Sequence, residues 1–207
     1  MADLCAVSDV ENLLQVEIDG DVDKVAYCQR AISEASAAIR NYCHQYIGLV
    51  EDESITLDVW APRWNLVLPE LPVVSVASVV EDGDTLTEGS DEDYVLAQYG
   101  QLIRRGRRWA VGPQIVVVTY SHGYDEIPDD VAAVCARAAS RAYQAGLRAA
   151  EDEGIAGVVS KSLGDYAVSF GSEATGGVGQ GLMGVSGARM LLLSERDVLS
   201  AYRIRGA

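Results

Sequence analysis

The chain has 207 residues, 49% of them hydrophobic, and its 31 acidic residues outnumber 16 basic ones to give a net charge of −15. A chain of this length can bury a core without disulfide or metal staples. The negative charge argues against a protein that clamps DNA or RNA, because such binding neutralises phosphates with Lys and Arg. No signal peptide is recognisable, and no run approaches the roughly 20 apolar residues that span a bilayer.

The charge is unevenly distributed. Residues 1–99 contain 20 Asp or Glu against 4 Lys or Arg, whereas residues 100–150 contain 7 basic and 4 acidic side chains. The acidic half either keeps the chain soluble or faces a partner, such as DNA that passes without being held. The four cysteines are scattered along the chain, which favours a reduced, intracellular setting.

Two helices are predicted at the N-terminal end. Residues 9–15 form a short helix with Ser8 as its possible N-cap. Residues 22–47 carry apolar side chains at spacings of three and four, which predicts a long amphipathic helix. We expect Gly48 to end it.

Between residues 54 and 120, short apolar runs with alternating polarity predict a sheet. Strands are expected at 54–60, 66–68, 73–80, 94–98, 101–105 and 114–120. The turns at 81–84 and at Tyr99–Gly100 separate neighbouring runs by the few residues that a hairpin allows. The sheet is therefore expected to be antiparallel.

A strand, a glycine turn and a helix start follow one another near residue 123. The β-branched run 115–120 ends at Gly123, which has the φ freedom of a sharp exit. Pro128 and the acidic pair after it, Asp129 and Asp130, are typical of a first helical turn. The Ala-rich helix at 128–148 is expected to pack against the helix at 22–47, in the same chain or a neighbouring subunit.

The C-terminal part, residues 151–207, has a different composition. Ten glycines fall between residues 154 and 187, and a segment of this kind does not easily hold its own core. A strand is expected near 163–170, and a final helix with Ser194 as N-cap and Asp197 at its third position. The segment either orders on a partner or stays disordered.

The predicted fold class is α+β, with two parts. A core at 1–150 packs the N-terminal helices and the Ala-rich helix together around an inserted antiparallel β region at 54–120. An extended Gly-rich arm at 151–207 ends in a short helix.

Three patterns that suggest chemistry have better structural explanations. Residues 179–184 (GQGLMG) have dinucleotide-loop spacing but lie outside a βαβ unit, and Cys43–His44 lacks a second pair to complete a zinc shell. His122 precedes four carboxylates within nine residues, yet an acidic helix start accounts for them. We therefore predict no catalytic, cofactor-binding or metal-binding residues.

One basic cluster stands out in an otherwise acidic chain: Arg104, Arg105, Arg107 and Arg108, next to Trp109. It can contact DNA phosphates, pair with acidic residues of an adjacent subunit, or form a solvated hairpin end. Four arginines are few for a DNA site but enough for guanidinium–carboxylate pairing, so we favour the inter-subunit interpretation. Trp60 and Trp64 flank a proline loop, and they either anchor a partner or belong to the core.

The order of elements over residues 5–148 resembles the head-to-tail connector (adaptor) proteins of tailed double-stranded DNA bacteriophages. The segments that carry the resemblance are Leu68–Val80 (LPELPVVSVASVV), Tyr94–Leu96, Gly100–Arg104, Trp109, Val117–Tyr124 and Ile127–Val131. The Gly-rich segment and final helix lie outside the well-matched part.

This resemblance implies a structural virion protein of the neck, made in the host cytoplasm, without enzymatic activity, cofactor or membrane. The implied partners are further copies of the chain in a ring of about 12, the portal protein, a downstream neck or tail protein, and double-stranded DNA passing through the lumen. The C-terminal arm would bind the portal through apolar side chains, namely Leu182, Met183, Met190, Leu191, Leu192, Leu193, Leu199 and Tyr202.

Three alternatives remain open at this stage. The chain can be another neck or tail-completion protein of the virion. It can be an acidic inhibitor that mimics nucleic acid, or a small hydrolase that uses the carboxylate cluster beside His122.

Overall fold

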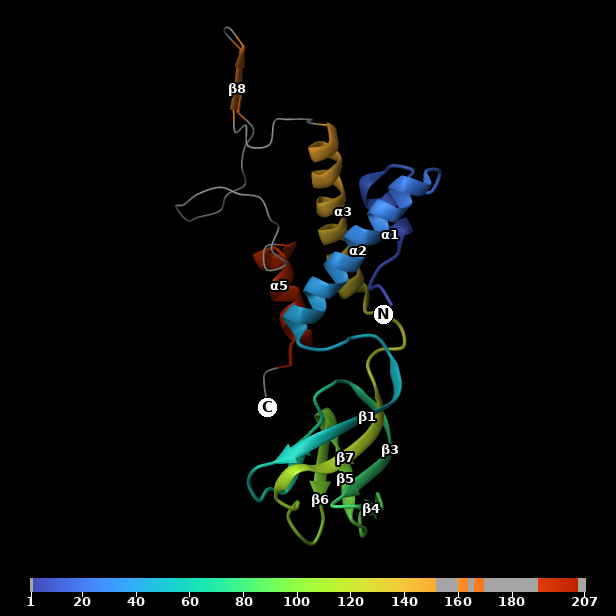
Figure 1. Cartoon of the computed structure of the whole chain (residues 1–207), viewed down its shortest axis with the longest axis vertical. Helices are drawn as coiled ribbons and strands as arrows, with labels where there is room; N and C mark the ends of the chain where they lie inside the picture. Colours follow the sequence, from blue (N-terminus) through green and yellow to red (C-terminus); the bar gives the residue numbers. More distant parts are fainter. Residues whose placement is uncertain (1, 152–159, 164–165, 170–189, 205–207) are drawn as a thin grey trace.

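The structure is a computed structural model that describes residues 2–151, 160–163, 166–169 and 190–204. It is elongated, with the helices at one end and the strands of residues 50–122 at the other (Figure 1). The described helices are α1 (Val7–Leu14), α2 (Val22–Cys43), α3 (Asp129–Glu151) and α5 (Leu193–Leu199), with 3-10 turns η1 (Gln98–Gly100) and η2 (Ser200–Tyr202). The described strands are β1 (Val50–Val59), β2 (Asn65–Val67), β3 (Val73–Glu81), β4 (Asp84–Leu86), β5 (Tyr94–Ala97), β6 (Gln101–Arg104), β7 (Gly112–His122), β8 (Ser160–Leu163) and β9 (Tyr166–Ser169). This composition confirms the predicted α+β class.

The helical unit has one hydrophobic core. α2 packs against α3, and α1 and α5 each contact both of them. Ile32 and Ile39 of α2 meet Val131 and Val134 of α3 in this core, and all four are fully buried. The apolar stripes predicted for the two long helices therefore do pack together, within one chain.

Two helix ends differ from the prediction. α1 begins at Val7 and includes Ser8, because the Asp9 carboxylate accepts a hydrogen bond of 2.8 Å from the Ala6 N–H and closes the first turn there. α2 ends at Cys43, before Gly48, because His44 adopts the left-handed conformation with φ 56°.

The chain's C-terminal helix belongs to the helical unit. α5 begins at Leu193, and Glu195 accepts a hydrogen bond from the Leu192 N–H, so Ser194 lies inside the first turn and is not the N-cap. The Arg141 guanidinium donates to both carboxylate oxygens of Glu195 at 2.7 Å. Residues 190–204 thus pack on the core, a contact that the sequence analysis did not assign to the end of the predicted arm at 151–207. The glycine-rich residues 170–189 lie outside the described part.

The β unit consists of two antiparallel sheets. The larger has the strand order β1-β7-β3-β4 and the smaller the order β2-β6-β5, while β8 and β9 pair as a separate hairpin. The six strands predicted between residues 54 and 120 are present, and both predicted hairpins form. Strand β4 was not predicted, because it is only three residues long and directly follows the turn at Asp82–Gly83.

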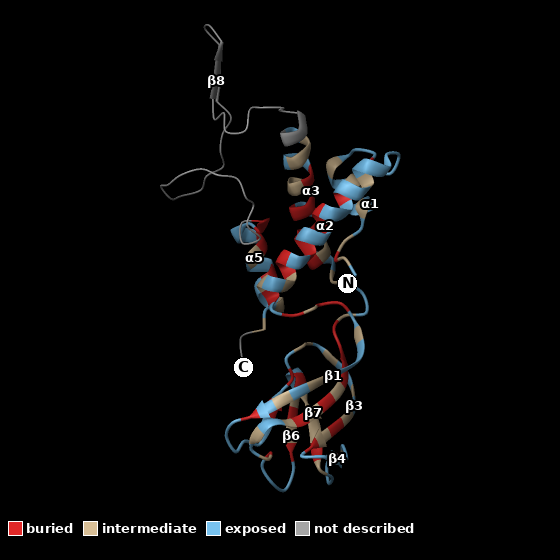
Figure 2. Ribbon diagram, viewed as in Figure 1, coloured by how far each residue is buried: buried red, intermediate tan, exposed pale blue. Residues whose placement is uncertain are grey.

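The two sheets share a second hydrophobic core. Val79 and Val118 from the larger sheet join Leu66 and Leu102 from the smaller one, together with Trp109. Buried residues accordingly occur along the strands of the β unit (Figure 2). The chain enters this unit once and leaves it once, between α2 and α3.

Two segments connect the helical unit with the β unit, residues 44–49 and residues 123–128, and their backbones are in contact. Gly123 has φ 93°, and a Cβ at this position would lie 2.0 Å from the carbonyl oxygen of Gly48. The Tyr124 N–H donates to the Ile47 carbonyl at 2.9 Å, and the Gly123 N–H to the Pro72 carbonyl at the same distance. The sharp exit predicted at Gly123 is therefore present, and glycine is the residue that allows it.

Candidate functional site

The first arginine of the basic cluster is internal to the β unit. Arg104 ends β6, and its side chain is only 4% exposed. Its Nε donates to Glu81 Oε2 at 3.1 Å, and its Nη1 lies 3.1 Å from Asp93 Oδ1. The pKa of the Asp93 carboxyl is lowered, first by the hydrogen bond from the Thr87 N–H and then by Arg104.

Glu81 is the fully buried carboxylate at the centre of this arrangement. Besides Arg104, it accepts hydrogen bonds from Arg107 Nη2 and from the Ala110 N–H, each at 2.7 Å. A buried carboxylate is tolerated when cations and amides satisfy its oxygens. Two of the predicted inter-subunit arginines, Arg104 and Arg107, are therefore paired within the chain.

The other two arginines lie apart from each other. Arg105 is exposed, and its guanidinium donates to the Ser90 carbonyl at 2.6 and 3.0 Å. Arg108 is exposed and lies over the Trp64 ring, 5.9 Å from the ring centroid. Among the described residues, neither Arg108 nor Arg63 forms an ion pair.

The two tryptophans singled out in the sequence are on the surface. They lie in the connection between β1 and β2, where Trp60 is 71% exposed and Trp64 48% exposed. Trp109 is buried in the core of the β unit. Exposed tryptophans are unusual on a monomer and are enriched in protein–protein interfaces.

Sequence reasoning missed an acidic surface. The exposed carboxylates between residues 82 and 92 are those of Asp82, Asp84, Glu88, Asp91 and Glu92. No Lys or Arg occurs in this stretch. The sequence contains this signal, a run of acidic residues without a basic one. It does not stand out, because the whole first half of the chain is acidic.

The predicted portal-binding residues divide into buried and exposed ones. Met190, Leu191 and Leu199 are buried against the helical core, whereas Leu192 is 48% exposed and Leu193 76% exposed. The Tyr202 hydroxyl donates to the Asp130 carboxylate at 2.7 and 2.9 Å. Leu182 and Met183 lie outside the described residues. The apolar side chains that remain open to a partner here are Leu192 and Leu193.

The residues considered for chemistry do not assemble into a site. His122 is buried, and its Nε2 lies 2.7 Å from Glu53 Oε2 on β1 instead of near the carboxylates that follow it in the chain. Cys43 is buried and His44 exposed. Within the described ranges, no cluster of His, Cys, Asp and Glu could hold a metal ion. The GQGLMG segment at 179–184 lies outside those ranges.

A groove of about 620 Å³ lies where the β unit meets the C-terminal segment. Leu71 and Pro72 before β3, Tyr99 of η1, and Tyr202 and Arg203 after α5 line it. Tyr99 is 79% exposed. Residues from distant parts of the sequence form this groove, so no local sequence pattern predicts it.

In the part of the chain that the structure covers, none of the helices has the length and apolarity needed to cross a bilayer.

Comparison with solved structures finds similar chains in gene transfer agent (GTA) particles. A chain from the neck of an empty GTA particle, computed with C6 symmetry, has 14% sequence identity and a TM-score of 0.50, with 97% of this chain and 90% of that chain covered. A chain from the neck of a native GTA particle, computed with C12 symmetry, has 15% identity and a TM-score of 0.44, with the same coverage. A chain from the virion of a native GTA particle has 13% identity and a TM-score of 0.49.

No protein-family model matches the chain, and no curated protein matches it. At 14% identity, the likeness to the first GTA neck chain shows a shared fold. It extends over nearly the whole chain, including the C-terminal part that the sequence resemblance left out.

Proposed function

We propose that this protein is a non-enzymatic structural component of a virion neck. In this proposal it is a head-to-tail adaptor, which forms a ring below the portal, extends the DNA channel and offers a docking surface to the next neck or tail protein. The observation that carries the proposal is the fold shared with a chain of a GTA particle neck over 97% of the present chain. The resemblance of the sequence segments within residues 68–131 to phage head-to-tail connector proteins also supports it.

Self-association into a ring is the first element of this proposal. The neck of the similar GTA particle was computed with C6 symmetry, which is compatible with a ring of 12 copies. Heterologous contacts between identical chains close into rings when the rotation between neighbours fits. The chain's net charge of −15 suits a lumen through which DNA slides, because few cations are present to hold phosphates.

Docking on the portal is the second element. Leu192 and Leu193 are adjacent, apolar and exposed at the start of α5, so they are the surface residues of the predicted arm that a partner can cover. The acidic β unit, which lies at the opposite end of the molecule from α1, would then face the next neck or tail protein.

The direct test is to locate the chain in an intact particle. The full-length protein with a small tag is incorporated into particles, and an electron-microscopy reconstruction is searched for the tag density. Rings of tag density between capsid and tail are expected. Density elsewhere in the tail would favour the alternative of a tail-completion protein, and a chain absent from the particle would contradict a structural role.

A further inference from the structure

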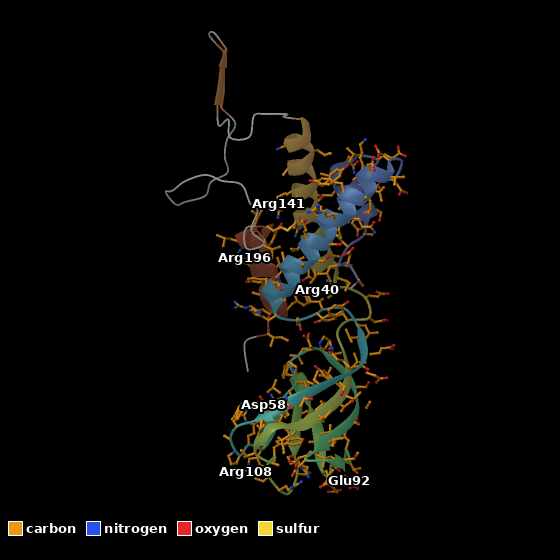
Figure 3. The ribbon with its side chains drawn as sticks, in the orientation of Figure 1. Arg40, Asp58, Glu92, Arg108, Arg141 and Arg196 are labelled. Carbon is orange, nitrogen blue, oxygen red and sulfur yellow. The ribbon has the colours of Figure 1, made fainter. Side chains whose placement is uncertain are left out.

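The connections between strands place two different surfaces on opposite sides of the β unit. Strands β1 and β4 are the two edges of the larger sheet, and β2 and β5 are the two edges of the smaller one. Residues 60–64 join β1 to β2, and residues 87–93 join β4 to β5. Residues 60–64 therefore lie at the edges formed by β1 and β2, and residues 87–93 lie at the opposite edges, formed by β4 and β5. Arg108 and Glu92 are indeed seen on opposite sides of the β unit (Figure 3).

The first surface, the Trp–Arg face, consists of Trp60, Arg63, Trp64 and Arg108. All four side chains are exposed. Arg108 and Trp64 form a cation–π pair, and both arginines lack an ion-pair partner within the described part of the chain. Asp58, two residues before Trp60, accepts a hydrogen bond from the Gln114 N–H. Trp and Arg are the residue types that contribute most to binding when an interface buries them.

The second surface, the acidic face, consists of Asp82, Asp84, Glu88, Asp91 and Glu92. These five side chains are exposed, and the hydrogen bonds from the Arg105 guanidinium to the Ser90 carbonyl fix the loop that carries Glu88, Asp91 and Glu92. Neighbouring Asp93 is different, because it is already engaged by Arg104 and by the Thr87 N–H. Among the described residues these five carboxylates form no ion pair, and the Arg105 guanidinium bound to Ser90 offsets only part of their charge.

We propose that the Trp–Arg face of one copy binds the acidic face of the next copy, an inference that rests on the proposed ring. The two faces have complementary charge, and they lie on opposite sides of the same unit. A contact of this kind is heterologous, so every open oligomer keeps one free face of each type, at its two ends, until the ring closes. Two acidic faces repel each other, which disfavours a symmetric dimer through that surface.

The proposal assigns different roles to the two kinds of side chain. The tryptophans would supply the buried area at the centre of the contact, and the charges would set its orientation and its partner. Exposed ion pairs are screened at physiological salt, where the Debye length is about 8 Å. Assembly should therefore weaken as salt is raised.

Charge reversal with compensation tests the assignment. Native mass spectrometry and sedimentation of the full-length protein would give the concentration at which half of the chains are assembled. We expect Arg63→Glu with Arg108→Glu to raise this concentration about tenfold, and Glu88→Arg with Glu92→Arg to raise it similarly. The variant with all four changes should return to within about threefold of wild type, because its two faces attract each other again.

A control and a folding check make each outcome decisive. Arg30→Glu reverses a charge on α2, where the side chain is 77% exposed, and should leave assembly unchanged. Equal thermal unfolding midpoints would show that all variants are folded. If the wild type forms a ring and both double-reversal variants assemble equally well, the assignment of faces is overturned. The same holds if the fourfold variant does not recover assembly. In both cases the proposed ring itself stands. A wild-type chain that stays monomeric at every concentration would overturn the proposed ring as well.

Discussion

Glu81 shows how one buried side chain gives neighbouring arginines different roles. Its carboxylate holds Arg104 inside the β unit and accepts a hydrogen bond from Arg107, which stays on the surface. It also accepts a hydrogen bond from the Ala110 N–H. Arg108 comes next in the chain after Arg107 but is directed to Trp64 instead. The four arginines are therefore close in sequence and different in role.

Replacing Glu81 by Gln should destabilise the protein by about 3–5 kcal/mol, because the buried guanidinium of Arg104 would lose its charged partner. Urea unfolding followed by circular dichroism measures the change. Asp82→Asn alters the exposed neighbour and should change the free energy of unfolding by less than about 0.5 kcal/mol. Equal stability of the two variants would contradict the structural role of Glu81.

Tyr202 joins the C-terminal segment to the start of α3. Its burial, and then its hydrogen bond with Asp130, raise its pKa to about 12. The folded state thus favours the protonated phenol more than the unfolded state does, where the pKa is about 10. The resulting stabilisation is complete below pH 10 and is lost as the pH rises to 12.

Tyr202→Phe should therefore reduce the loss of stability between pH 10 and pH 12. At neutral pH it should cost about 0.5 kcal/mol, since one partly exposed hydrogen bond is removed. Free energies of unfolding measured at several pH values test both effects. The matched control is Tyr99→Phe, whose side chain is 79% exposed, and it should keep the wild-type pH dependence. Identical alkaline profiles for the Tyr202→Phe and wild-type chains would refute the assignment.

At the scale of elements, α5 is the main departure from the sequence prediction. Its length and position were nearly correct, since a helix was expected from Ser194. Its packing was not predictable, because Leu199 and Leu191 are separated in sequence from their partners in α2 and α3 by the glycine-rich stretch. Local patterns identify an amphipathic helix but not the surface that it covers.

Two leucine substitutions separate the packed side of α5 from its open side. Leu199→Ala should lower the free energy of unfolding by about 2–5 kcal/mol, because its side chain is fully buried. Leu193→Ala should lower it by less than about 0.5 kcal/mol, because its side chain is 76% exposed. Chemical denaturation gives both values. A helix that tolerates both changes equally would not be packed on the core.

The strands were more predictable than the site. Alternating polarity and the turns at Asp82–Gly83 and Tyr99–Gly100 indicated nearly the whole antiparallel region, because hairpins are local structures. The pairing of Arg104 with Glu81 crosses 23 residues, and no pattern in the sequence distinguishes it from pairing with another chain. Exposure of Trp60 was likewise undecided between core and surface until the sheets were placed.

At the scale of the whole molecule, the two units have separate hydrophobic cores. The β unit is one continuous stretch of chain, whereas the helical unit combines stretches before and after it. A continuous stretch with its own core meets the requirement for independent folding. The helical unit needs both of its parts.

A fragment of residues 49–124 should consequently fold without the helices. We expect a cooperative thermal transition and the same tryptophan emission maximum as in the full chain, since all three tryptophans lie within the fragment. Circular dichroism and fluorescence check these properties. The same fragment with Glu81→Gln serves as the comparison and should unfold at a lower temperature. A fragment without a cooperative transition would show that the β unit depends on the helical unit.

The contact between Gly48 and Gly123 has a mechanical consequence. The two segments that join the units are tied to each other by the hydrogen bond from the Tyr124 N–H to the Ile47 carbonyl, while the Gly123 N–H is held by Pro72 at the end of the β unit. Sliding one segment along the other would break the first bond and separate the close Gly48–Gly123 contact. The pair of segments therefore resists shear between the units more than a single linker would.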